Sequence, residues 1–239
     1  MIEKKLTIGE IARKLPSAVR FFEKAGIDYC CGGQVPIEEA CRNQGLDVAT
    51  VIAALETIQD LDNLSESEHN WNTESLPKLV QHIVDKHHVV VRQEVPRLVT
   101  LINKMCEAHG EKRPEFLEVQ KLISELKAEL DAHLQKEEVV LFPYVQQLEQ
   151  SKGSSAPVPH SCFGTVRNPI AAMEHEHENA GAMLSLIQSH LTDRTGCPTC
   201  LEFFRTFDDF EADLHQHIHL ENNILFPRTI ELEAEVASR

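Results

Sequence analysis

An internal repeat constrains the fold of this chain more than any other feature of its sequence. The segment HLQKEEVVLFP at 133–143 recurs as HIHLENNILFP at 217–227, so both copies read H-x3-E-x3-LFP. Positions i and i+4 of an α-helix lie on the same face, so each copy presents an imidazole and a carboxylate together. The residues that recur, and that the repeat makes candidate metal ligands, are His133, Glu137, His217 and Glu221.

A second pair of histidine-bearing segments precedes the two copies. His87 and His88 lie upstream of the first copy, and His175 and His177 lie upstream of the second at a similar distance. This arrangement predicts two related helical hairpins, in which the first helix of each hairpin turns one histidine toward the His/Glu face of the second. The spacing leaves open which histidine of each pair does so.

Four histidines and two glutamates that project inward from four helices are enough to hold two metal ions. Each ion would have two imidazoles, both glutamates would bridge the ions with an oxo or hydroxo group, and one position would stay open. This donor set suits iron or manganese better than a closed tetrahedral zinc site. A lone helical histidine is more often an ordinary core or surface residue, but six ligand-type residues in repeated register are costly to bury without a partner.

The hydrophobic pattern predicts an all-α protein. Apolar residues at helical spacing continue over four long segments, each with a proline near its first turn. These segments are 77–108, 114–150, 168–190 and 198–234. Their length, with no strand pattern between them, predicts a four-helix bundle over 77–239.

The beginning of the chain predicts a separate small domain of short helices at 1–60. Thr7-x-x-Glu10 is a capping-box pattern, which marks the start of a helix. Residues 61–76 are polar and lack periodicity, and we interpret them as a linker between the small domain and the bundle.

Composition argues against several classes of function. Lys and Arg number 23 and Asp and Glu number 38, so a net charge of −15 disfavours nucleic acid and anionic membranes as partners. Charges interrupt every apolar run well before the roughly 20 residues of a membrane span, and the N-terminus lacks the apolar core of a signal peptide. Seven scattered cysteines fit reduced thiols better than a disulfide framework, so we expect a cytoplasmic protein.

Two pairs of cysteines have contrasting contexts. Cys30 and Cys31 are adjacent and precede two glycines, and a disulfide between neighbours would be strained and easily reduced. This favours a redox, NO-carrying or metal-relay role, although the residues alone fit two buried thiols equally well. Cys197 and Cys200 form a C-x2-C at the start of a predicted helix. We interpret them as incidental thiols, with a disulfide as the second interpretation and zinc only weakly indicated.

The whole chain resembles the RIC (repair of iron centres) di-iron proteins. That family combines a hemerythrin-like four-helix bundle with a short preceding domain that bears adjacent cysteines. The segments that carry the resemblance are DYCCGG at 28–33, HIVDKHH at 82–88, HLQKEEVVLFP at 133–143, MEHEHENAG at 173–181 and HIHLENNILFP at 217–227. The combination of CCGG with two H-x3-E-x3-LFP motifs makes the resemblance specific.

The resemblance implies a carboxylate-bridged di-iron centre with an oxo or hydroxo bridge. Its ligands, carried over by motif, are His88, His133, Glu137, His177, His217 and Glu221. His88 is preferred to His87 by its register with the downstream Val95-Pro96, and His177 is preferred to His175 by the HENAG context. Glu129 and Glu176 resemble carboxylates that line a route to the metals, and they fit equally well as outer-layer or solvated charges.

The function that the resemblance implies is repair of iron–sulfur clusters damaged by nitrosative or oxidative stress. The di-iron centre would donate iron, react with NO, or both, and Cys30 and Cys31 would be the catalytic thiols. The expected partners are damaged iron–sulfur proteins and NO or O2, with a homodimer formed through the small domain. The alternatives are a di-iron NO reductase, an NO-forming nitrite reductase, or an NO/O2-binding sensor like hemerythrin.

Overall fold

The computed structural model describes residues 2–62, 70–152 and 159–238. Within these ranges the chain is helical, and the β contact found there is an isolated bridge between Thr7 and Pro36. The predicted all-α fold class is therefore confirmed.

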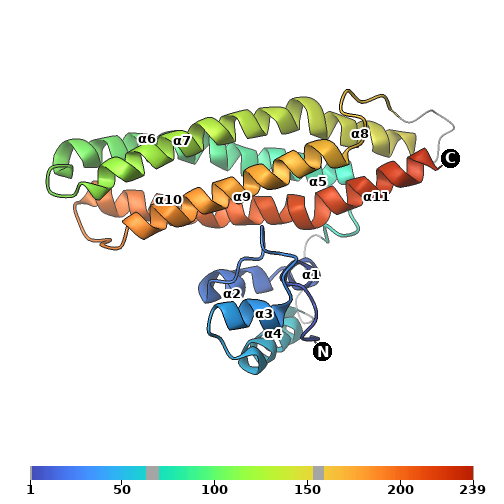
Figure 1. The fold of residues 1–239 in the computed structure, drawn as a ribbon, viewed down its shortest axis with the longest axis horizontal. Helices are drawn as coiled ribbons and strands as arrows, with labels where there is room; N and C mark the ends of the chain where they lie inside the picture. The colour runs from blue at the N-terminus through green and yellow to red at the C-terminus, as the bar shows by residue number, and fades with distance from the viewer. Residues whose placement is uncertain (1, 63–69, 153–158, 239) are drawn as a thin grey trace.

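Four long helical rods, arranged up and down, form the larger part of the molecule in the described ranges (Figure 1). The first rod consists of α5 (Leu76–His82), η1 (Ile83–His88) and α6 (Val89–His109). The second consists of α7 (Glu115–Lys136), η2 (Glu137–Leu141) and α8 (Phe142–Ser151). The third is α9 (Arg167–His190), and the fourth consists of α10 (Pro198–Leu220), η3 (Glu221–Leu225) and α11 (Phe226–Ala237). The predicted four-helix bundle is the observed architecture.

Three of the rods contain a π-helical turn at a predicted ligand. His88 ends η1, Glu137 begins η2, and Glu221 begins η3. A proline follows the second and third of these turns, because Pro143 and Pro227 occupy the first turns of α8 and α11. Proline has no N–H for the carbonyl four residues before it, so the wider turn falls where a regular helix would lose a hydrogen bond. The LFP part of the repeat therefore marks a change of helical pitch.

The small domain contains four helices in its described part. They are α1 (Ile8–Lys14), α2 (Ala18–Ala25), α3 (Ile37–Asn43) and α4 (Val48–Asp62). The predicted capping box is present, because the Glu10 amide donates to Thr7 Oγ1 at 3.2 Å and the Thr7 amide donates to Glu10 Oε2 at 2.9 Å. Gly26 ends α2 with a φ of 65°, a left-handed conformation that glycine adopts without strain.

The small domain packs directly on the bundle, below α9, α10 and α11 in the view of Figure 1. Its buried apolar residues belong to one continuous cluster with those of α6, α7 and α10. At the boundary, the ring of Tyr29 contacts the rings of His215 and His219 on α10, with centroids 6.3 and 5.6 Å apart. The two parts of the chain therefore share a hydrophobic core.

One side chain of the bundle approaches the small domain so closely that two positions there require glycine. Asn223, which is buried in η3, donates through Nδ2 to the carbonyl oxygens of Tyr29 (3.2 Å) and Cys30 (3.4 Å). A Cβ added at Gly9 or Gly33 would lie 2.3 or 2.5 Å from Asn223 Oδ1. The second glycine of the CCGG motif is thus required by the close approach of the bundle.

Between the two parts, the predicted linker at 61–76 overlaps residues 63–69, which lie outside the described residues. α4 extends to Asp62 and α5 begins at Leu76, so residues 61–62 and 76 of the predicted linker are helical. None of the helices in the described ranges has the length and apolar character that a membrane span requires.

The close approach predicts that Gly33→Ala destabilises the protein by about 1–3 kcal/mol, because Asn223 is held by its hydrogen bonds and cannot yield without losing them. Gly181→Ala on α9 is the matched control. Its Cβ would meet Cys31 Sγ at 3.8 Å, an ordinary contact, and alanine is favoured over glycine in a helix by up to about 1 kcal/mol. Urea unfolding of both variants tests the prediction, which fails if Gly33→Ala is as stable as the wild type.

Candidate metal centre

Six predicted ligands meet inside the bundle, and all four rods contribute. The first rod supplies His88, the third supplies His177, and the second and fourth supply one His/Glu pair each. Their potential ligand atoms form two clusters in which all atoms lie within 4.8 Å of one another. One cluster contains His88, Glu137, His217 and Glu221, and the other contains His133, Glu137, His177 and Glu221. Both glutamates belong to both clusters.

Each shared carboxylate turns one oxygen toward each cluster. Glu137 Oε2 lies 3.3 Å from His88 Nε2, and its Oε1 lies 3.4 Å from His133 Nε2. Glu221 repeats this arrangement across the bundle, with Oε1 3.2 Å from His217 Nε2 and Oε2 3.2 Å from His177 Nε2. This is the arrangement that two carboxylates bridging two cations require.

Burial tests whether these residues fit a metal. Glu137 and Glu221 are fully buried, and among the described residues none of their four carboxylate oxygens has a hydrogen-bond partner. The same holds for His88 Nε2 and His217 Nε2. Burying a carboxylate without compensation is prohibitively costly, and the converging imidazoles offer lone pairs to the same space. The donor set therefore fits bound cations.

The outer nitrogens of three imidazoles have acceptors that fix their orientation. His88 Nδ1 lies 2.5 Å from Glu138 Oε1, and His133 Nδ1 lies 2.8 Å from Glu176 Oε2. His177 Nδ1 lies 2.8 Å from the amide oxygen of Asn222. A proton donated from Nδ1 leaves the Nε2 lone pair facing the clusters, as a metal-binding histidine requires.

At this site, neighbouring charged groups shift the pKa values in the direction opposite to that caused by burial. Burial alone raises the pKa of Glu221, but the rings of His217 and His177 hold that pKa well below its usual range. For His133, burial lowers the pKa, but Glu137, Glu221 and Glu176 together raise it to about 9. Positive charge is thus stabilised at the shared carboxylates, which is the property of a cation site.

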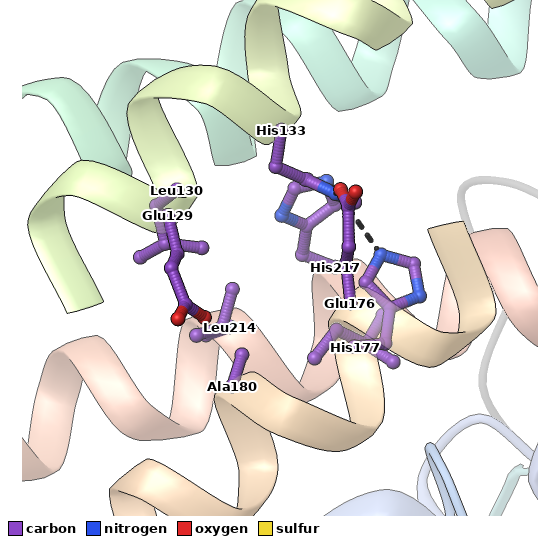
Figure 2. Close-up of a pocket in the computed structure, with 9 residues that line it drawn as sticks. Glu129, Leu130, His133, Glu176, His177, Ala180, Leu214 and His217 are labelled. Carbon is purple, nitrogen blue, oxygen red and sulfur yellow. Dashed lines mark hydrogen bonds and ion pairs between the residues drawn. The ribbon is translucent and has the colours of Figure 1, made fainter. Parts of the chain in front are cut away.

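A small cavity adjoins the ligands and is shown in Figure 2. Its walls include His133, His177 and His217 together with Glu129 and Glu176. It offers about 10 Å³ to the centre of a water molecule, which is room for about one water-sized ligand. Glu129 is exposed at this cavity, whereas Glu176 lies half-buried in contact with His133.

The structure separates the members of the two ambiguous histidine pairs. His88 and His177 lie in the clusters, whereas His175 is exposed beside Glu178. His87 is buried but lies outside both clusters, and its Nδ1 is 3.0 Å from Asp213 Oδ2. This placement agrees with the motif register, and the role of the six residues as ligands stays a prediction.

The predicted catalytic thiols lie beside the ligand helix α9. Cys31 Sγ is 3.6 Å from the carbonyl oxygen of His177, and the Sγ atoms of Cys30 and Cys31 are 3.8 Å apart. The carboxylate of Asp28 accepts hydrogen bonds from three amides, those of both cysteines and Gly32, at 2.9–3.0 Å. Contact with Cys31, together with burial, raises the pKa of Cys30 well above its usual range.

Sequence reasoning missed the contacts of Glu138 and Asn222. The two residues occupy the same position in the repeat, directly after the shared glutamate, and each accepts from a histidine of its own hairpin. Aligning the two copies brings out this position, but a glutamate matched by an asparagine gives no sign of a common role. Only the spatial contact shows it.

Comparisons with known proteins agree with this geometry. Residues 79–229 match the hemerythrin HHE cation binding domain. Residues 4–59 match a domain of unknown function, DUF542. The cation-binding description covers the segment that contains both His/Glu clusters.

Several curated relatives are similar over nearly the whole chain. The iron-sulfur cluster repair protein YtfE of Edwardsiella ictaluri is 33% identical over 93% of this chain and 96% of its own length. The protein of the same name from Musicola paradisiaca is 33% identical over 95% of this chain and 97% of its own. The one from Escherichia coli O157:H7 is 31% identical, with coverages of 93% and 96%.

The clusters predict different outcomes for two histidines of the same helix. His177→Ala removes an imidazole from one cluster, and we expect it to lower the bound metal by roughly half or more, because three donors then remain where four converged. His175→Ala, two residues away on the surface, should keep the full metal content. Elemental analysis of both purified variants checks this. Equal metal in the two would refute the placement of His177 as a ligand.

Proposed function

The chain belongs to the family of iron–sulfur cluster repair proteins, and we propose that it restores iron–sulfur clusters damaged by nitric oxide or oxidants. The repair would take place in the cytoplasm, where thiols such as the seven free cysteines of this chain stay reduced. Damaged iron–sulfur proteins would be its partners, and NO or O2 its small ligands.

The metal that fits this role is a pair of iron ions. His88 and His217 would hold one ion, His133 and His177 would hold the other, and Glu137 and Glu221 would bridge the two. When bound, the irons would supply exchangeable ferrous iron and an open position for a diatomic ligand. The protein itself positions the imidazoles through their Nδ1 acceptors and offers the cavity beside His133 and His177.

The observation that carries the proposal is the contact between the cysteine turn and the metal-centre helices. Asn222 joins them, because its Oδ1 accepts from His177 Nδ1 at 2.8 Å while its Nδ2 donates to the Cys30 carbonyl at 3.4 Å. The Cys31 thiol also contacts this helix, because its Sγ lies 3.6 Å from the His177 carbonyl oxygen. A chain of direct contacts therefore runs from the thiols to a candidate ligand.

The cysteine turn has the donors to receive an iron ion. Asp28, Cys30 and Cys31 bring a carboxylate and two sulfurs within 4.8 Å of one another. The same residues line a solvent-open pocket of about 460 Å³, whose other walls include Gly181 of α9 and His215 of α10. A client cluster that enters this pocket would meet the thiols directly, so we assign iron relay to the cysteine pair.

This assignment predicts that Cys30→Ala combined with Cys31→Ala keeps the metal but loses repair. The six bundle residues are untouched, so metal content should equal that of the wild type. Reactivation of an NO-damaged [4Fe–4S] dehydratase should fall to the rate given by ferrous iron in buffer. Cys162→Ala, at an exposed cysteine, is the control and should repair normally. Undiminished repair by the double variant would remove the cysteines from the mechanism.

The same assay separates repair from the alternatives. Stoichiometric loss of iron from the protein during reactivation supports iron donation. Continuous consumption of NO with an electron donor, without loss of iron, would instead support a reductase.

A further inference from the structure

A third group of metal-binding side chains lies far along the bundle from the six-residue centre. His109 ends α6, Cys197 precedes α10, and Cys200 lies in the first turn of α10. The α6–α7 and α9–α10 connections meet at this end of the bundle, on the left in Figure 1. The His/Glu repeat does not include these three residues.

Their side chains converge. Cys197 Sγ lies 3.5 Å from Cys200 Sγ and 3.4 Å from His109 Nε2, and all three donor atoms lie within 4.8 Å of one another. Ligands around a tetrahedral zinc ion are roughly 3.5–3.8 Å apart, as follows from Zn–S of about 2.3 Å and Zn–N of about 2.0–2.1 Å. The observed spacing is therefore close to that of a tetrahedral ion.

The local electrostatics favour thiolate. Cys197 is at the N-cap of α10, where the amides of Thr199 and Cys200 and the helix dipole stabilise negative charge. The imidazole of His109 and these amides lower the pKa of Cys197 to about 6, whereas burial raises the pKa of Cys200. The N-terminus of α10 thus favours negative charge at the position where the three donor atoms converge.

The two connections that carry the donors are tied together. Arg113, four residues after His109, donates to the carbonyl oxygens of Thr195 (2.9 Å) and Asp193 (2.5 Å) in the other connection. Gly196 packs against the second cysteine so closely that a Cβ there would lie 2.8 Å from Cys200 Cβ. These contacts join the two connections that carry the donors and place Gly196 directly against Cys200.

We propose that His109, Cys197 and Cys200 form a further metal site, specific for a thiolate-binding cation of the Zn²⁺ type, with an open fourth position. Two thiolates and an imidazole are typical zinc ligands, and three protein ligands leave one tetrahedral position for water or for a ligand from another molecule. Cys197 and His109 are half-buried, so that position is reachable from solvent.

The imidazole distinguishes this site from a simple dithiol. Sequence reasoning favoured incidental thiols because a lone C-x2-C has no partner, and no motif links His109 to it. The structure supplies that third donor from another helix. Zinc binds such a set more tightly than ferrous iron does, so this site differs in metal preference from the carboxylate-bridged centre.

The test uses the full chain, loaded with iron, kept reduced and titrated with Co²⁺ as a coloured substitute for Zn²⁺. We expect about one additional ion per chain, a thiolate-to-cobalt charge-transfer band, and loss of that band when Zn²⁺ is added. Zn²⁺ should also protect Cys197 from alkylation by iodoacetamide at pH 7.

Matched variants assign the band to its residues. Cys197→Ser should abolish it and His109→Gln should weaken it, and both changes are at half-buried positions. Cys162→Ser and the double variant Cys30→Ser with Cys31→Ser should keep the band. A circular dichroism spectrum of each variant confirms that it is folded.

Three results would overturn the proposal. One is a band that survives Cys197→Ser, and another is a band that disappears with the Cys30/Cys31 variant. The third is a reduced wild-type protein that takes up no additional cobalt or zinc but closes the C-x2-C into a disulfide when exposed to air.

Discussion

The burial of two carboxylates is the constraint on which the rest of this structure depends. Glu137 and Glu221 lie at the centre of the bundle without a hydrogen bond from any described residue. Such groups destabilise a fold unless positive charge compensates them. The rings of the four clustered histidines point Nε2 at them, and the π-helical turns η2 and η3 begin at the carboxylates themselves. The bundle is therefore organised around a place that fits cations, and three of its rods change helical pitch there.

The small domain depends on the same region, although it adds no residue to the six. Asn223 extends from the turn that begins with Glu221 and reaches the Tyr29 and Cys30 carbonyls. Its neighbour Asn222 connects the same turn to His177. The CCGG segment is thus folded against helices of the candidate metal centre, and the cysteines owe their position to residues of the bundle.

The sequence predicted those parts of the structure that a local pattern encodes. The repeat predicted four of the clustered residues and the hairpin architecture, since residues at i and i+4 of a helix share a face whatever surrounds them. The choice between His87 and His88 required register, because the π-helical turn η1 at 83–88 breaks the 3.6-residue period that would otherwise distinguish adjacent helical residues. The docking of the small domain was not predicted, because Asn223 is an ordinary polar residue in the sequence. The contact between His109 and the C-x2-C was not predicted either, because it depends on how the α6–α7 and α9–α10 connections meet in space.

The two halves of the bundle are not equivalent, and the difference lies in the layer outside the six candidate ligands. In the first hairpin His88 donates to the carboxylate of Glu138, which also pairs with Arg92, whereas in the second His177 donates to the neutral amide of Asn222. A carboxylate acceptor makes an imidazole a stronger donor to a metal, while an amide mainly fixes its orientation. The amide lies on the side of the cysteine turn, where it also binds the Cys30 backbone. An asparagine at this position of the repeat therefore has two effects. Its neutral oxygen makes His177 a weaker electron donor than a carboxylate would, and its Nδ2 holds the backbone of the cysteine turn.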